Sequence, residues 1–169
     1  MPTELAKIVR DTLVESGFRS ARSCYRDYRF ILAIVAGVVV VWGMLAWVKP
    51  YPESVQYHVV QLLSIILIQP VFEEILFRGI IQGQLGQYNW GKRSWLIVSH
   101  ANIFTSVVFV AMHMINSPPL HALSILAPSL VFGYFRDKYQ SVYPAIVLHV
   151  SYNAMVFIGL MISNRLEII

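Results

Sequence analysis

Long apolar segments follow one another along most of this 169-residue chain and constrain its fold more than any other feature. A helix needs about 20 mostly apolar residues to cross the hydrocarbon core of a bilayer. The chain is 57% hydrophobic and only 13% charged, unlike an ordinary soluble domain. We therefore predict an all-α, polytopic transmembrane helical bundle of about five spans. The predicted spans are residues 30–48, 55–86, 96–115, 120–135 and 142–162.

The first 29 residues are more polar than the rest. Residues 3–17 can form an amphipathic interfacial helix, and four arginines follow it. We expect 1–29 to be a cytoplasmic lead-in and 30–169 to be the transmembrane core. Since 1–29 contains no apolar signal-peptide core or cleavage site, we expect the first apolar segment to remain as a span. The apolar face of the predicted helix contains Leu5, Ile8, Val9, Thr12 and Leu13.

The positions of the cations predict an orientation. The N-terminus, residues 92–93 and residues 136–138 are basic, whereas the loops at 49–55 and 116–119 contain only one cation, Lys49. Because cytoplasmic loops are enriched in Lys and Arg, we expect the N-terminus to be cytoplasmic. The net charge of +4 is explained by membrane topology, so nucleic acid is not an expected partner. Cys24 is the only cysteine, which excludes an intrachain disulfide.

Six ionisable or strongly polar side chains lie inside the apolar segments. A charged residue at the centre of a span costs about 2.5–3.5 kcal/mol on insertion scales. These side chains are therefore expected to face protein or a water-filled cavity. They are Glu73, Glu74, Arg78, His113, His149 and Asn153.

Helical spacing divides these residues into groups. Glu74 and Arg78 are four residues apart, which predicts a structural ion pair. Glu73 is rotated by about 100° from Glu74, and no cation lies one turn away on its face, so we predict that it is a general acid or base. His149 and Asn153 share a helix face and can bind a developing oxyanion. A single histidine in a span usually only packs, but this combination on three helices indicates a shared site.

Three motifs, "EEILFR" (73–78), "FVAMH" (109–113) and "HVSYN" (149–153), resemble the EExxxR, FxxxH and HxxxN/D motifs of the CPBP family of intramembrane proteases. That family includes the type II CAAX prenyl endopeptidases and the abortive-infection-like bacterial proteins. The order and spacing of the motifs agree over residues 73–153.

The resemblance implies that Glu73 and His113 activate water, and that His149 and Asn153 form an oxyanion hole. Glu74, Arg78 and Phe109 would be supporting residues. The implied reaction is hydrolysis of a peptide bond in a membrane-associated or C-terminally anchored substrate, without a covalent acyl-enzyme and without a cofactor. The resemblance also suggests a multi-pass protein of a prokaryotic plasma (inner) membrane, with a peptide or protein substrate and the lipid bilayer as its partners.

Two other classes of function stay open. A zinc protease could use Glu73, His113 and His149 as ligands, although its usual HExxH motif is absent. A non-enzymatic immunity or transport scaffold could also contain these residues, although we find none of the inverted repeats common in transporters.

Overall fold

The computed structural model describes residues 16–47, 55–162 and 166–168, together with Glu4, Ala6, Lys7, Thr12 and Val14. Most of the predicted amphipathic helix at 3–17 therefore lies outside the described residues. The described chain is mostly helical, which confirms the all-α class in its general form. It also contains four very short strands, which we did not predict.

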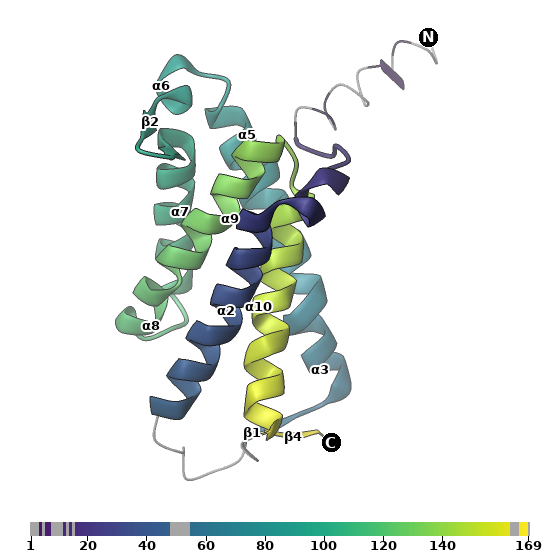
Figure 1. Cartoon of the computed structure of the whole chain (residues 1–169), viewed down its shortest axis with the longest axis vertical. Helices are drawn as coiled ribbons and strands as arrows, with labels where there is room; N and C mark the ends of the chain where they lie inside the picture. Colours follow the sequence, from purple (N-terminus) through teal and green to yellow (C-terminus); the bar gives the residue numbers. More distant parts are fainter. Residues whose placement is uncertain are drawn as a thin grey trace.

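Consecutive long helices run in alternating directions, so that each is antiparallel to the next along the chain (Figure 1). A 3-10 turn, η1 (Arg22–Arg26), precedes α2 (Tyr28–Trp47). A continuous helix from Val59 to Leu85 follows, and it combines α-helical and π-helical segments. These segments are α3 (Val59–Leu63), the π-helix η2 (Ser64–Ile68), α4 (Gln69–Glu74), the π-helix η3 (Ile75–Ile81) and α5 (Gln82–Leu85).

The second half of the chain contains α6 (Asn89–Lys92), α7 (His100–His113), α8 (Pro119–Ser124), α9 (Leu126–Tyr139) and α10 (Tyr143–Ile162). Strands β2 (Ser94–Trp95) and β3 (Val98–Ser99) form an antiparallel hairpin just before α7. Strands β1 (Val55–Tyr57) and β4 (Leu166–Ile168) pair in parallel at the opposite end of the bundle (Figure 1).

Several predicted boundaries were wrong, because tertiary pairing overrides hydrophobicity at the ends of the apolar segments. Residues 55–57 pair with β4 instead of beginning the second helix. The third helix begins at His100 rather than at 96, since the chain turns back at Leu96, where φ is 56°. The predicted span 120–135 is divided between α8 and α9, and α9 continues through the charged residues 136–138 to Tyr139.

The outward faces of the helices are apolar, and the interior combines an apolar core with buried polar side chains. Two helices, Val59–Leu85 and Tyr143–Ile162, are long and apolar enough to cross a membrane, and only 17% and 22% of their apolar windows are buried. A core helix of a soluble protein would be mostly buried, so these surfaces are suited to lipid. Two shorter apolar helices cover Tyr28–Gly43 and His100–His113. The predicted number of five crossings stays a prediction.

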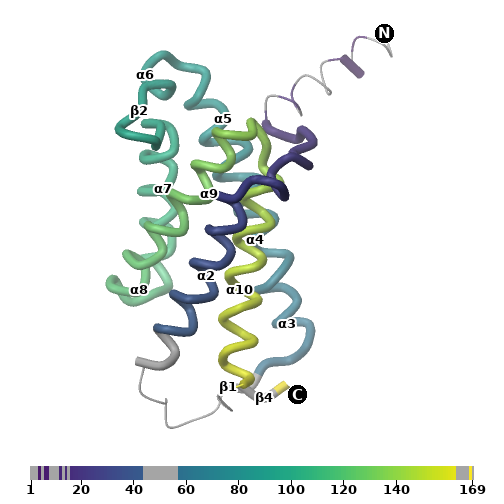
Figure 2. Tube along the Cα trace, viewed as in Figure 1, coloured from purple at the N-terminus to yellow at the C-terminus, as the bar shows by residue number. Residues whose placement is uncertain are grey.

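The core lies where α2, α9 and α10 meet, and Figure 2 shows α2 and α10 running side by side. The hydroxyl of Tyr152 on α10 donates a 2.7 Å hydrogen bond to the Ala33 carbonyl on α2. The helices α4 and α7 contact α10 and α9, respectively, so the motif residues are brought together by packing. The buried cluster comprises Cys24, Phe30, Phe132, Phe135, Ala145 and Leu148.

Candidate active site

The two adjacent glutamates of α4 have different surroundings. The side chain of Glu74 is completely buried, and its Oε1 accepts a 2.8 Å hydrogen bond from His149 Nδ1. Its Oε2 lies 3.3 Å from Arg78 Nε, which forms the predicted i,i+4 ion pair. The side chain of Glu73 is 32% exposed, and its Oε2 lies 3.7 Å from His149 Nε2, beyond hydrogen-bond distance. Glu74 is therefore fixed by two partners, whereas Glu73 stays accessible.

Arg78 contacts α7 and α9 and so anchors the helix that carries Glu73 and Glu74. Its Nη2 donates to the carbonyl oxygen and to the Oγ of Ser129 on α9, at 2.9 and 2.7 Å. Its guanidinium carbon lies 5.2 Å from the centre of the Phe109 ring on α7. Arg136 of α9 donates from Nε to the Arg78 carbonyl at 3.0 Å. These contacts hold α4 and η3 at a defined position against α7 and α9.

His149 lies between the two glutamates. Because a carboxylate only accepts hydrogen bonds, the bond to Glu74 assigns a proton to Nδ1 of His149. In the neutral ring, Nε2 then has a free lone pair on the side of Glu73. The imidazole stacks on the Phe132 ring at a centroid distance of 5.1 Å. This packing fixes the plane of the ring.

His113 is the last residue of α7 and has a similar arrangement. Its Nδ1 lies 2.9 Å from the Phe109 carbonyl, which can only accept, so Nε2 is again the free nitrogen of the neutral ring. The Phe109 ring lies 4.4 Å from the His113 ring and 6.0 Å from the His149 ring. The two imidazole centres are therefore no more than 10.4 Å apart.

Asn153 makes a contact that its spacing from His149 does not predict. It lies one turn after His149, and its Nδ2 donates a 2.9 Å hydrogen bond to the Ile65 carbonyl in η2. Within η2, the N–H of Gln69 bonds to the Ser64 carbonyl, five residues back. At the same spacing, the donor to Ile65 would be residue 70, which is a proline and has no N–H. The proline inside a helical segment is the sequence signal for this contact, because it removes one backbone N–H.

All seven predicted residues thus lie around α4, α7 and α10, but two of them make contacts other than the predicted ones. His149 is bonded to Glu74 rather than presenting both nitrogens, and Asn153 uses one amide hydrogen on Ile65. No spacing rule links α9 to the motifs, so the sequence did not predict the roles of Ser129, Phe132 and Arg136. Among the described residues, no group of three or more His, Cys, Asp or Glu side chains is arranged to hold a metal ion.

Comparison with known proteins identified a family for the chain. The family model "Type II CAAX prenyl endopeptidase Rce1-like" matches residues 55–155, which is more than half of the chain and includes all three motifs. A search of curated proteins and a search of solved structures each found no significant match.

Proposed function

The chain belongs to the Rce1-like family of type II CAAX prenyl endopeptidases, and we propose on this basis that it is an intramembrane endopeptidase whose Glu73 and His113 activate the attacking water. The family is a family of membrane proteases, so a peptide substrate at the membrane follows from membership. The proposed substrate is a membrane-associated or C-terminally anchored protein.

The observation that carries the proposal is the unequal environment of the two glutamates. The carboxylate of Glu74 is buried, and it forms an ion pair with Arg78 and a hydrogen bond with His149. Glu73 is partly exposed and makes no hydrogen bond to the described residues, so its carboxylate is available to take a proton from water. His113 supports the same role, since its free Nε2 is a second acceptor.

In this mechanism, Glu73 and His113 remove a proton from water, and the resulting hydroxide attacks the scissile carbonyl. The oxyanion is bound by the second amide hydrogen of Asn153 and by His149 Nε2–H. His149 can donate from Nε2 only when its ring carries both protons, because Nδ1–H is already donated to Glu74. When the tetrahedral intermediate collapses, its C–N bond breaks and the proton taken from water is transferred to the leaving amine.

We also propose five membrane crossings with a cytoplasmic N-terminus, in a prokaryotic plasma membrane. The alternating directions of α2, the 59–85 helix, α7, α9 and α10 support this number (Figure 1). Basic residues from separate segments gather at one end, where Lys138 pairs with Asp27 and where Lys92 and Arg136 line the same cavity. This asymmetry is what the positive-inside rule requires.

The deciding experiment compares Glu73→Gln with the exposed control Glu4→Gln, using candidate anchored peptides in native membranes. We expect Glu73→Gln to insert normally and to lose cleavage by at least about a hundredfold, the usual minimum for removing a general base. The control should cleave at the wild-type rate. Full cleavage by Glu73→Gln would rule out the mechanism.

The zinc protease stays the second candidate, because one feature favours it. Both histidines donate Nδ1–H to an oxygen and leave Nε2 free, as metal-bound histidines commonly do. A chelator distinguishes the two readings: retained cleavage after chelation supports the metal-free mechanism, and loss restored by zinc supports the alternative. If the protein is a non-enzymatic immunity or transport scaffold, even the wild type should not cleave the peptides. Its membrane phenotype should then persist in Glu73→Gln.

A further inference from the structure

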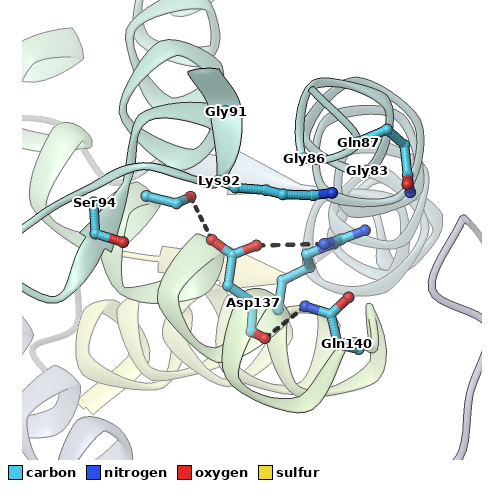
Figure 3. A pocket seen from close by; sticks show the side chains of 10 residues that line it. Gly83, Gly86, Gln87, Gly91, Lys92, Ser94, Asp137 and Gln140 are labelled. Atoms are coloured by element: carbon cyan, nitrogen blue, oxygen red, sulfur yellow. Dashed lines mark hydrogen bonds and ion pairs between the residues drawn. The ribbon is translucent and has the colours of Figure 1, made fainter. Parts of the chain in front are cut away.

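A polar cavity lies between the α5–α6 connection, the β2–β3 hairpin and the C-terminal end of α9. Its volume is about 240 Å³, far above the roughly 15 Å³ that one water molecule needs. Gly83, Gly86 and Gly91 form part of its wall, so no side chains fill it there. Figure 3 shows the Lys92 side chain extending across this cavity, and the α4 glutamates are not among the lining residues.

The single carboxylate in the cavity wall is already neutralised by the protein. Oδ1 of Asp137 accepts a 2.8 Å hydrogen bond from Gln82 and lies 3.3 Å from Arg136 Nη1. Oδ2 accepts a 2.5 Å hydrogen bond from Ser99 (Figure 3). Asp137 therefore stabilises the wall and leaves the cavity with a surplus of positive charge.

Lys92 supplies that surplus, because the charge of Arg136 is balanced by Asp137. The side chain of Lys92 is exposed and has no ion-pair partner among the described residues. Arg136 is only 5% exposed and donates from Nε to Arg78 and from Nη1 to Asp137. Its Nη2 makes no hydrogen bond within the described part of the chain. A bound anion would therefore receive charge-assisted hydrogen bonds from both side chains.

The surroundings of the cavity indicate where the anion comes from. The turn of the β2–β3 hairpin exposes three consecutive apolar side chains, Trp95, Leu96 and Ile97, to 70%, 83% and 74%. Tyr88 and Trp90 of the adjoining segment are also exposed. Tyr and Trp concentrate at the headgroup level of membranes, where amphipathic rings are stable. The cavity is thus next to an apolar hairpin suited to the membrane interface.

We propose that this cavity binds the phosphate of an anionic phospholipid headgroup, with Lys92 and Arg136 as donors and with the 95–97 turn inserted among the lipids. A zwitterionic choline headgroup would bring its own cation beside Lys92, which disfavours it. The site is independent of the catalytic roles of Glu73 and His113, since neither residue lines it.

The test uses the purified full chain in detergent and measures retained lipid by native mass spectrometry. Phosphatidylglycerol and phosphatidylcholine with identical acyl chains are offered at equal concentration. We expect preferential retention of phosphatidylglycerol, reduced about fivefold to tenfold in Lys92→Gln by the loss of one charge-assisted contact. Arg93→Gln is the matched control, because Arg93 is the adjacent exposed cation and does not line the cavity. It should retain lipid within about twofold of the wild type.

Three results would overturn the proposal. Equal retention of the two lipids by the wild-type protein would show that the cavity does not discriminate between their headgroups. Equal losses in Lys92→Gln and Arg93→Gln would show general attraction to a basic surface rather than a site. Inorganic phosphate that displaces the lipid at equimolar concentration would assign the cavity to free phosphate. Because Lys92 is exposed, circular dichroism of Lys92→Gln should show wild-type folding and exclude a trivial loss.

Discussion

The side-chain amide of Asn153 donates a 2.9 Å hydrogen bond to the carbonyl oxygen of Ile65, five residues before a proline. Gln69 bonds to Ser64, and Pro70 has no N–H to offer, so the nearest donors of the helix do not serve this carbonyl. The contact joins α10, which carries His149, to the helix that carries both glutamates. One residue predicted to bind an oxyanion therefore also fixes the relative position of two motifs.

This relationship predicts that Asn153→Ala lowers the free energy of unfolding by about 1–3 kcal/mol, because it leaves a carbonyl unpaired inside the bundle. Pro70→Ala restores an N–H five residues after Ile65 and should recover about 1 kcal/mol of that loss in the double variant. Unfolding in detergent, followed by circular dichroism, measures both effects. Ser151→Ala is the control, since Ser151 bonds only within its own helix, to Val147.

A purely additive double variant would contradict the link between Asn153 and Pro70. If stability recovers but cleavage does not, the activity of Asn153 lies in its second amide hydrogen, as the proposed oxyanion role requires. The pair of variants thus separates a positioning role from a catalytic role.

Substitutions of the two glutamates should lower the free energy of unfolding by unequal amounts. Glu74→Gln leaves the buried guanidinium of Arg78 without its counter-charge, and breaking a buried pair costs about 3–5 kcal/mol. Glu73→Gln removes a partly exposed group outside hydrogen-bond distance of its neighbour and should cost less than about 1 kcal/mol. Thermal unfolding of the two variants in the same detergent checks this order. Equal losses would contradict the division of roles.

Gly133 on α9 should not tolerate a side chain. A Cβ atom at this position would collide with the side chain of Asn102, which is fully buried and bonded to Leu130 and Ser106. Gly133→Ala is therefore expected to destabilise the packing of α7 on α9 by about 1–3 kcal/mol. Gly43→Ala on α2 is the matched control, because nothing lies within 4 Å of its Cβ position, and helix propensity predicts a gain of about 0.5–1 kcal/mol. A similar loss in both variants would indicate a general intolerance of helix substitutions instead.

Stability at acidic pH should depend on Asp27, which lies before α2. Hydrogen bonds from Lys138 and Tyr139 lower the pKa of its carboxyl from 3.8 to about 2. Folding therefore favours the charged form of Asp27. The contribution of this carboxylate to the stability of the fold is complete above pH 3.8 and is lost as the pH falls towards 2. Asp27→Asn should be less stable than the wild type at neutral pH, and the difference should shrink between those two pH values.

Denaturant titrations at a series of pH values measure this convergence. Tyr139→Phe removes one of the two donors and should give an intermediate profile. A constant difference between Asp27→Asn and the wild type down to pH 2 would show that the carboxylate charge does not matter.

Several features of the fold and site followed from local pattern alone. Apolar runs predicted a helical membrane bundle because lipid requires every backbone polar group to be paired within a segment. The four-residue spacing of Glu74 and Arg78 predicted their ion pair, since that spacing aligns side chains on one helix face. Helix ends were less predictable, as at residues 55–57, because pairing with β4 depends on a segment more than a hundred residues away.

The amino-acid sequence by itself determined the membrane class, the family motifs and the separation of Glu73 from the Glu74–Arg78 pair, because each depends on composition or on spacing within one helix. Only the tertiary structure decided which atoms meet between helices. There, His149 Nδ1 forms a hydrogen bond with Glu74, Asn153 with Ile65, and Arg78 with Ser129. Such contacts depend on the rotation and depth of each helix against its neighbours, and those are set by the packing of the whole bundle.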